Sequence, residues 1–221
     1  MKILVAGATG RTGRRIVNQL CQQNIEVRAL VRDRAKAQGL FPNEVEIVTG
    51  DVTEPKSLSE IWGGITGVIC ATGASPSLNP LEPFFVDYRG TINLYESAKA
   101  HSVRRFVLVT SLCVSQFFHP LNLFWLILFW KRQAEMDLVK SGLTYTIVRP
   151  GGLKEANDEQ PILMSEADSR FEGSIPREKV AEVCVQSLLN ETANNKIIEI
   201  VTAPEGSTES WEKRFAAVAA S

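Results

Sequence analysis

The sequence lacks a strong charge of either sign and contains only two histidines. Its 221 residues include 24 lysines and arginines against 25 aspartates and glutamates, which gives a net charge of -1 at pH 7. A balance this close to neutral argues against nucleic acid as a partner, because binding a phosphate backbone needs an excess of basic residues. The histidines His101 and His119 have no cysteine or carboxylate companions at ligand spacing, so no metal site is expected.

Cysteine is scarce, and no apolar segment is long enough to span a membrane. The cysteines are widely spaced in apolar runs without a CxxC pair, so we expect reduced core residues at Cys21, Cys70, Cys113 and Cys184. The most apolar run, residues 117–130, has fourteen residues and is too short to cross a bilayer core of about 30 Å. Residues 2–4 already enter the first predicted strand. This leaves no room for a signal or transit segment and predicts a cytoplasmic location.

Apolar runs of strand length alternate with segments of helical periodicity. Strands are predicted at residues 3–6, 27–31, 45–48, 68–71, 106–109, 145–148 and 197–201. Helices are predicted after the first strand, at 90–100, at 131–141, from 176 onward and at 211–220, and a loop at 75–89. This alternation predicts an α/β fold with a doubly wound parallel sheet of about seven strands. The length and the 44% hydrophobic content fit a single domain, residues 1–221, with a small substrate-side region at about 150–180.

Three glycines stand between the first predicted strand and the first predicted helix, in the segment Gly7-Ala8-Thr9-Gly10-Arg11-Thr12-Gly13. Gly7 permits a tight turn, Gly10 lets backbone N–H groups approach an anion, and Gly13 lets the helix pack closely on the strand. An anion placed here meets the unpaired N–H groups and the positive dipole end of the helix. The segment therefore predicts a site for a dinucleotide pyrophosphate, formed by Gly7, Thr9, Gly10, Arg11, Thr12 and Gly13. The alternative is an ordinary turn between a strand and a helix.

The residue after the second predicted strand is Arg32. A cofactor with a free ribose 2′-hydroxyl usually finds Asp or Glu at this place, whereas an arginine suits a 2′-phosphate. A charge-assisted hydrogen bond of about 1.5–3 kcal/mol corresponds to roughly tenfold or greater discrimination, so the sequence favours NADP over NAD. The alternative is that Arg32 and Arg34 are solvated loop charges paired with Asp33.

Two further strand ends are predicted to contact the cofactor. Asp51 can accept a hydrogen bond from the adenine amino group, or it can cap a helix that Pro55 opens. Small residues end the fourth strand and would let a cofactor lie against the backbone, since ligands of open α/β sheets bind outside the carboxyl ends of the strands. We therefore assign adenine to Asp51 and Val52, and the ribose and nicotinamide side to Ala71, Thr72 and Gly73.

These residues resemble the atypical short-chain dehydrogenase/reductases, in particular a small NADP-binding branch with flavin reductase-like and plastid or cyanobacterial members. The likeness covers nearly the whole chain. It rests on the glycine turn, on Arg32 and on four motifs: Gly50-Asp51-Val52, Thr110-Ser111, Trp130-Lys131-Arg132-Gln133-Ala134-Glu135 and Thr146-Ile147-Val148-Arg149-Pro150-Gly151-Gly152-Leu153. The resemblance implies a Rossmann-type NADP(H)-binding domain, and it is specific for fold and cofactor but much less so for the reaction.

The resemblance also implies roles for two catalytic candidates. Ser111 matches the serine that hydrogen-bonds a substrate carbonyl, and Lys131 matches the lysine that holds the nicotinamide ribose. The family tyrosine should stand one helical turn before the lysine, where this chain has Ile127. The residues alone leave two alternatives, a strand-end capping hydroxyl for Ser111 and an ion pair with Glu135 for Lys131.

Isoleucine at position 127 makes ordinary ketone reduction doubtful. Hydride addition to a ketone forms an alkoxide, and the loss of a positioned proton donor removes about 10²–10⁴-fold in rate. An acceptor that delocalises charge, such as a flavin or quinone, can take its proton from water. We therefore expect an NADPH-dependent oxidoreductase with a hydrophobic or delocalised acceptor. The alternative is a non-catalytic NADP(H)-binding scaffold, sensor or assembly factor that docks a partner protein or a membrane face through residues 117–130.

Residues 117–130 carry apolar side chains on every face of a helix, and such side chains are normally covered. One interpretation is a buried helix that also forms a homodimer face. The others are an apolar wall for a hydrophobic substrate, and docking onto a membrane face or a membrane protein. His119 in this run is either a candidate proton donor or an ordinary loop residue.

Overall fold

A mainly parallel sheet runs through the middle of the molecule. The computed structural model describes residues 1–74, 78–123 and 125–219. In this part of the chain eight strands form one sheet, in the order β3-β2-β1-β4-β5-β6-β10-β8. They are β1 (Lys2–Ala6), β2 (Glu26–Val31), β3 (Glu46–Thr49), β4 (Gly67–Cys70), β5 (Arg105–Val109), β6 (Thr144–Pro150), β8 (Ile162–Glu166) and β10 (Lys196–Thr202). The first six are arranged as in a doubly wound Rossmann sheet, so the predicted fold class is confirmed.

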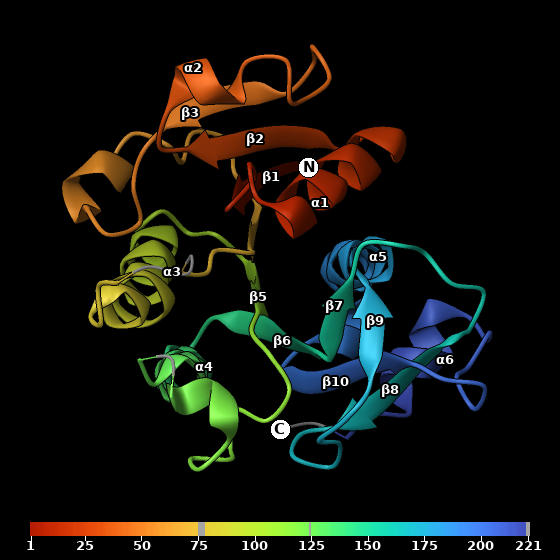
Figure 1. Ribbon diagram of the computed structural model, residues 1–221. Coiled ribbons are helices and arrows are strands. Elements are labelled where there is room, and N and C mark those ends of the chain that lie inside the picture. Colours follow the sequence, from red (N-terminus) through yellow and green to blue (C-terminus); the bar gives the residue numbers. More distant parts are fainter. Residues whose placement is uncertain (75–77, 124, 220–221) are drawn as a thin grey trace.

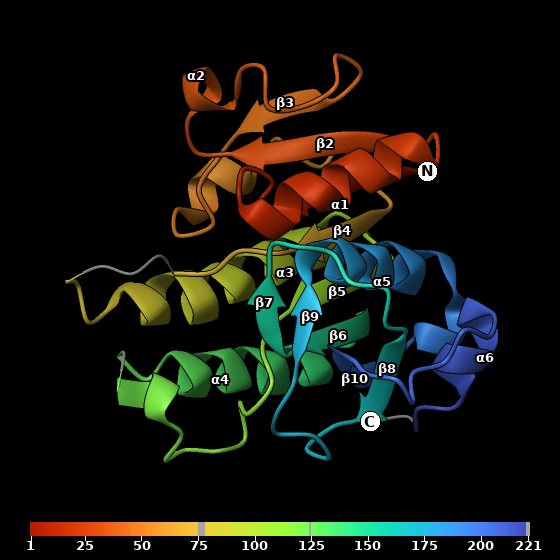
Figure 2. The same ribbon diagram turned by 45° about the vertical axis from the view of Figure 1, so that its right-hand side comes forward.

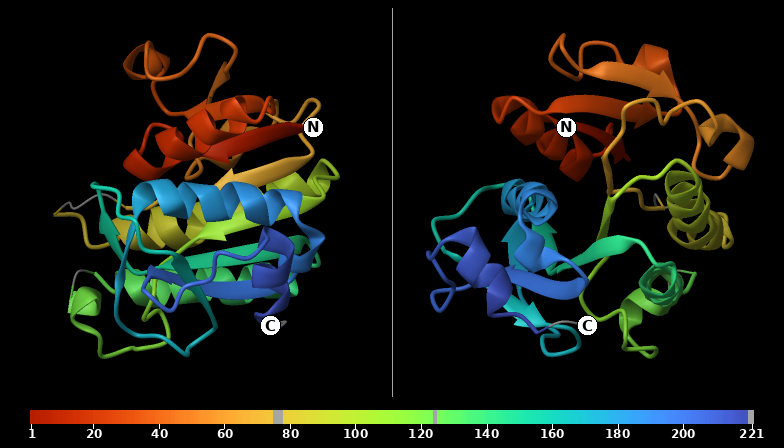
Figure 3. Two further views of the ribbon diagram at one scale, coloured as in Figure 1. Left: turned by 90° about the vertical axis from the view of Figure 1, so that its right-hand side faces the viewer. Right: turned by 180° about the vertical axis from the view of Figure 1, so that it is seen from behind.

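Helices cover both faces of this sheet (Figure 1). On one face α1 (Arg11–Gln22) packs against α5 (Arg177–Leu189), and on the other lie α3 (Gly90–Ala100) and α4 (Ile127–Lys140). Figure 3 shows the same two layers from the side and from behind. The shorter helices are α2 (Arg34–Ala37), η1 (Pro55–Leu58), η2 (Phe84–Arg89), η3 (Pro120–Leu123), η4 (Glu191–Ala193) and α6 (Trp211–Ala216). None of the helices in the described ranges has the length and apolar character needed to span a membrane.

Burial of the helix faces holds the layers together. On α1 the fully buried side chains are Ile16, Val17 and Leu20, which recur at helical spacing and face the sheet. Each large apolar side chain removed from water contributes roughly 1.5–3 kcal/mol. The strands between the layers are apolar on both faces for the same reason. Because the strands are parallel, their carboxyl ends meet at one edge of the sheet, which is also where α1 begins (Figure 2).

Three short strands were not predicted from the sequence. β8 pairs antiparallel with β10 and closes one edge of the sheet, and only Ile162 in it is fully buried. β7 (Gly152–Lys154) and β9 (Ser174–Pro176) form a separate parallel pair. None of the three has a long apolar run or a regular alternation, so their pairing depends on partners far along the chain. The last helix is also shorter than predicted, since α6 ends at Ala216.

The loop predicted for residues 75–89 is only partly a loop. Residues 75–77 lie outside the described residues, but η2 is a wide helix of the π type that continues directly into α3. Pro83 stands at its N-cap, where a proline costs no helical hydrogen bond. The ring of Phe84 packs edge-on against Trp130 of α4, with centroids 4.9 Å apart. Prolines therefore mark the beginning of this helix and do not exclude it.

Candidate functional site

The glycine turn folds the chain tightly between β1 and α1. Gly7 has a φ of +76°, and a Cβ there would stand 2.5 Å from the carbonyl oxygen of Ala71. A Cβ on Gly13 would lie 2.1 Å from the carbonyl oxygen of Gly7, so α1 packs directly on the turn. Gly10 is the N-cap of α1 and has no side chain to cap the first N–H groups, which can then donate to an anion. The turn therefore fits a pyrophosphate.

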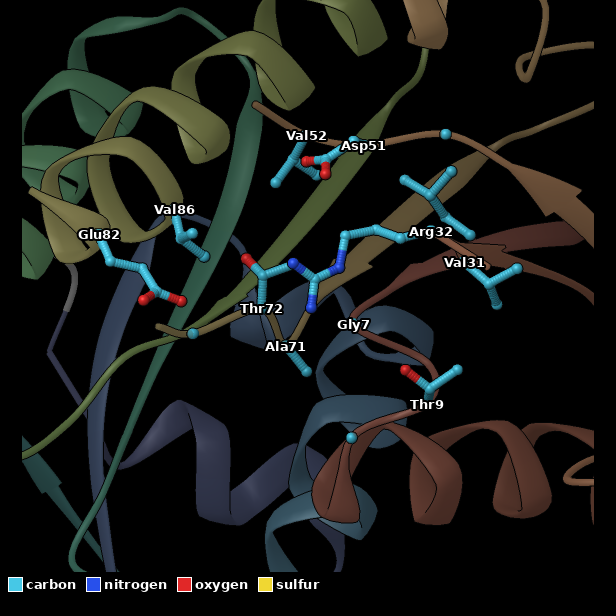
Figure 4. Close-up of a pocket in the computed structure, with 14 residues that line it drawn as sticks. Gly7, Thr9, Val31, Arg32, Asp51, Val52, Ala71, Thr72, Glu82 and Val86 are labelled. Carbon is cyan, nitrogen blue, oxygen red and sulfur yellow. The ribbon is translucent and has the colours of Figure 1, made fainter. Parts of the chain in front are cut away.

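A pocket opens beside this turn, at the carboxyl ends of β1, β2, β3 and β4 (Figure 4). Its lining brings together nine predicted residues from the four strand ends: Gly7, Thr9, Gly10, Arg32, Asp51, Val52, Ala71, Thr72 and Gly73. The other lining residues are Leu30, Val31, Gly50, Glu82 and Val86. Arg11, Thr12 and Gly13 form the first turn of α1 and are not part of this lining. Glu82 and Val86 were missed because they lie in the segment predicted to be a loop.

Arg32 follows β2, and its side chain extends across the pocket toward Thr72 (Figure 4). Its neighbour Asp33 is the N-cap of α2 and accepts hydrogen bonds from the backbone N–H groups of Ala35 and Lys36. These backbone hydrogen bonds, that of Lys36 first, lower the pKa of Asp33. Arg34 donates to the carbonyl oxygen of Ile47 at 3.2 Å. This differs from the alternative in which Arg32 and Arg34 both pair with Asp33.

Asp51 stands in the pocket lining but also organises its own turn. Its Oδ1 accepts from the backbone N–H and from the hydroxyl of Thr53, both at 2.8 Å. The N-cap of the following helix η1 is Glu54, so the alternative in which Asp51 caps that helix is wrong. The carboxylate keeps lone pairs that can accept a further hydrogen bond from a ligand.

Lys131 is held by a carboxylate that the sequence analysis missed. Its Nζ lies 2.5 Å from Oδ1 of Asp87, whose side chain is only 1% exposed. The other oxygen of Asp87 accepts from the backbone N–H of Ala74 at 3.1 Å, just after the strand end assigned to the nicotinamide side. A Cβ built on Gly73 would lie 3.7 Å from Asp87 Oδ1 and 3.8 Å from Lys131 Nζ. The ion pair therefore stands directly against Gly73.

The alternative pairing of Lys131 with Glu135 is wrong. Glu135 accepts from the hydroxyl of Thr110 at 2.5 Å and pairs with Arg149, whose Nη2 lies 2.7 Å away. One signal in the sequence pointed to Asp87, because it is a lone carboxylate in an apolar segment and such a group is buried only with a cationic partner. Because residues 75–89 were predicted to form a loop, the burial of Asp87 was not predicted.

Ser111 and Ile127 stand at the ends of two elements. Ser111 lies two residues after the end of β5, and Ile127 is the first residue of α4. The side chain of Ile127 packs against an apolar cluster of Leu112, Cys113, Val114, Leu128 and Val201. An aliphatic side chain can neither donate nor accept a proton. The position of the family tyrosine is thus part of the apolar packing.

Residues 117–130 do not form one helix, so the interpretation of this run as a buried helix is wrong. After η3, both Trp125 and Leu126 have a left-handed φ of 58°, and α4 begins only after them. Asn122 stabilises the break, because its Oδ1 accepts from the backbone N–H of Leu128 at the start of α4, at 2.9 Å. The left-handed residues therefore separate η3 from α4, and Asn122 caps the N–H groups at the start of α4.

Much of this run faces solvent. Phe118 is 95% exposed and Leu123 is 83% exposed, and Phe117, Leu121, Trp125 and Leu126 are exposed as well. Phe124 lies outside the described residues. His119 belongs to the local turn, since its Nδ1 accepts from the backbone N–H of Leu121 at 3.2 Å. The beginning of α4, which follows this run, lies at the same end of the molecule as the beginning of α1 (Figure 2).

Known proteins match almost the whole chain. The family model described as NAD(P)H-binding matches residues 7–191. An uncharacterized chloroplastic protein of Arabidopsis thaliana is 44% identical over 230 residues, covering 98% of this chain and 82% of that protein. Sanguinarine reductase of Eschscholzia californica is 33% identical over 248 residues, covering 93% of this chain and 90% of that protein.

Two further matches concern length and fold. The chloroplastic protein TIC 62 of Pisum sativum is 36% identical over 232 residues, which cover 91% of this chain. The chain spans less than half of that protein, 43% of its length. Among solved structures, a putative NAD-dependent epimerase/dehydratase from Bacillus halodurans is 27% identical with a TM-score of 0.82, covering 92% of this chain and 94% of that one.

These matches correct one expectation and establish the family. The predicted cytoplasmic location is contradicted by the plant relatives, which are chloroplast proteins. The family match begins at Gly7 of the glycine turn and extends beyond α5, so it contains the pocket described above. The chain therefore belongs to the NAD(P)H-binding family, as its resemblance to the atypical short-chain dehydrogenase/reductases predicted.

Proposed function

We propose that this protein is an NADPH-dependent reductase whose acceptor is hydrophobic and delocalises charge, as a flavin or a quinone does. The observation that carries the proposal is the buried ion pair of Lys131 and Asp87 beside Gly73. It holds a cationic side chain where the nicotinamide ribose is expected, while residue 127 supplies no proton donor. The relative named sanguinarine reductase supports reductase chemistry.

Each part of the pocket has a proposed partner on the dinucleotide. The first turn of α1 and the glycine turn take the pyrophosphate, and the Arg32 guanidinium takes the 2′-phosphate, which favours NADPH over NADH. The adenine is assigned to Asp51 and Val52. The small residues 71–73 take the ribose and nicotinamide side, and residues of about 150–180 complete the substrate side.

The chain's own contribution to the reaction is orientation. Asp87 occupies one donor of the Lys131 ammonium, which leaves two N–H donors for the ribose hydroxyls. Ser111 is assigned the role of donating to an acceptor oxygen, and the acceptor takes its proton from water. NADPH, when bound, supplies the hydride. Correct positioning of two reactants contributes several kcal/mol to a rate enhancement without acid–base catalysis.

The ion pair can be tested by replacing either partner. We expect Lys131→Met and Asp87→Asn each to lower kcat/KM for NADPH oxidation by about tenfold with a flavin or quinone acceptor, since a misplaced reactant is costly. Steady-state kinetics with a panel of flavins, quinones and simple ketones measures this, and ketones are expected to be poor acceptors. Ser111→Ala should lower the rate with acceptors that carry a carbonyl oxygen.

The matched control is Lys140→Met, which removes an exposed ammonium from the last position of the same helix. It should leave kcat/KM unchanged. Wild-type protein that binds NADPH tightly but oxidises it with no acceptor of the panel would contradict the reductase function. Equal rates for wild type and Lys131→Met would contradict the role of the ion pair.

A second candidate function rests on the exposed apolar side chains of residues 117–126. Exposed patches of this kind mark interaction sites in soluble proteins. In this function the domain binds NADP(H) without turnover and docks onto a membrane face. Wild-type protein is then expected to sediment with liposomes, because Phe118 and Leu123 can enter the lipid interface.

The double variant Phe118→Ser, Leu123→Ser should stay in the supernatant of the same sedimentation assay. The control variant Leu189→Ser removes an apolar side chain that is 38% exposed at the end of α5, and it should sediment like wild type. Wild-type protein that does not sediment with liposomes would exclude membrane docking.

A further inference from the structure

Four charged side chains from three distant segments meet at the beginning of α1. Arg11 and Arg15 belong to α1, Glu155 directly follows β7, and Arg177 opens α5. The Glu155 carboxylate lies 2.9 Å from Arg11 Nη1, 3.3 Å from Arg15 Nη2 and 2.8 Å from Arg177 Nε. Arg15 also pairs with Glu178, whose Oε2 lies 3.4 Å from Arg15 Nε. Three guanidinium groups against two carboxylates still leave a net positive charge beside the glycine turn, where a phosphate group is favoured.

These four side chains differ in burial. Arg11 is 63% exposed and Glu155 is 50% exposed, whereas Arg177 is only 12% exposed. The Arg177 guanidinium, with Arg11 and Arg15 nearby, holds the pKa of the Glu155 carboxyl below its usual value. Because ion pairs with exposed partners add little stability, the cluster's main effect is to fix where the Arg177 guanidinium stands.

Arg177 makes a second contact, and this contact reaches the glycine turn. Its Nη1 donates a hydrogen bond to the Thr12 hydroxyl oxygen at 3.1 Å, although the two residues are 165 positions apart in the sequence. A hydroxyl carries one O–H donor and acceptor lone pairs on the same oxygen. Because the Arg177 guanidinium occupies an acceptor lone pair of the Thr12 oxygen, the Thr12 O–H is directed to donate to another group. We expect an anion bound at the glycine turn to accept that hydrogen bond.

We propose that Arg177 is a positioning residue of the nucleotide site, which orients the Thr12 hydroxyl to donate to the pyrophosphate. Glu155 holds Arg177 in the position from which it can do so. The inference rests on the nucleotide site given under the proposed function. It adds that affinity for the dinucleotide depends on a side chain of α5 that is not part of the pocket lining.

The test is a double-mutant cycle on NADPH affinity by isothermal titration calorimetry. Arg177→Met and Thr12→Val are each expected to weaken NADPH about tenfold, as the loss of one hydrogen bond to a charged group does. The double variant should bind within about twofold of Thr12→Val alone, because Arg177 acts through Thr12. Arg177→Lys keeps the positive charge but not the separate nitrogens that contact Glu155 and Thr12. It should bind NADPH as weakly as Arg177→Met, with circular dichroism confirming that the variant is folded.

The matched control is Lys179→Met, two residues further along α5. It removes a part-buried ion pair with Asp158 and should leave NADPH affinity unchanged. Unchanged affinity in Arg177→Met, or losses that multiply to about a hundredfold in the double variant, would overturn the positioning role. Wild-type protein that binds neither NADPH nor NADH would contradict the nucleotide site itself, and this inference with it.

Discussion

Replacing Arg149 by methionine is expected to lower the free energy of unfolding by about 3–5 kcal/mol, because it leaves buried carboxylates without their cation. Arg149 Nη2 lies 2.7 Å from Glu135, and Nη1 lies 2.8 Å from Asp168 and 3.2 Å from Glu199. The side chains of Glu135 and Glu199 are 2% and 1% exposed. These groups join β6, α4 and β10, so the loss affects the centre of the fold.

The pH dependence of this variant follows from Glu135. Burial raises the pKa of Glu135, and Arg149 opposes that rise. Without Arg149 the pKa of Glu135 in the folded state rises further, so the folded protein binds more protons than the unfolded chain. Stability then falls as the pH increases from the unfolded carboxyl's pKa through the raised value. The destabilisation by Arg149→Met should therefore be larger at pH 8 than at pH 5.

Urea unfolding followed by circular dichroism at the two pH values measures both effects. The double variant Glu135→Met, Arg149→Met should recover part of the loss, since an apolar pair can replace a buried ion pair. Arg89→Met, at an exposed position, is the control and should stay within about 0.5 kcal/mol of wild type. A loss below about 1 kcal/mol in Arg149→Met would show that the buried carboxylates do not need this cation.

Replacing Arg32 by aspartate is expected to weaken NADPH by tenfold to a hundredfold, while NADH affinity changes little. A hydrogen bond from a guanidinium to a phosphate contributes about 1.5–3 kcal/mol, and a carboxylate in its place would repel the 2′-phosphate. Arg32 extends into the pocket beside Thr72, so its removal affects the ligand directly (Figure 4). Calorimetric titration with each coenzyme measures the two dissociation constants.

A neighbouring arginine offers the control for this experiment. Arg34 lies on α2 and donates to the carbonyl oxygen of Ile47, outside the pocket lining. Arg34→Asp should leave the preference between the two coenzymes unchanged. Equal losses of NADPH and NADH affinity in Arg32→Asp would mean that Arg32 does not bind the 2′-phosphate.

The predictable parts of the fold are those encoded in neighbouring residues. The seven predicted strands occur in the sheet because each is an apolar run of strand length, and buried parallel strands need such runs on both faces. The glycine turn was predictable because a tight turn with a helix packed on it tolerates no Cβ at Gly7 or Gly13. Most residues of the pocket lining followed, since parallel strands bring their carboxyl ends to one edge.

The parts that were missed depend on specific side-chain or strand partners, two of them distant in the sequence. Asp87 is buried because it forms an ion pair with Lys131 of another helix, and no sequence pattern near Asp87 identifies that partner. The break at Trp125 and Leu126 depends on Asn122, whose amide oxygen takes the place of a helical carbonyl. β8 exists because β10 offers it an edge. For Asp87 and β8 the interaction that decides the conformation joins elements far apart along the chain, whereas Asn122 acts on a residue six positions away.

The sequence by itself determined the fold class and the place of the nucleotide pocket, because apolar periodicity, glycine spacing and the residue after β2 are local properties. Only the tertiary structure decided which charges are paired: Lys131 with Asp87, Glu135 with Arg149, and Glu155 with three arginines. The physical reason is that a buried charge needs a counter-charge within a few ångströms, and the folded arrangement alone determines which side chains come that close.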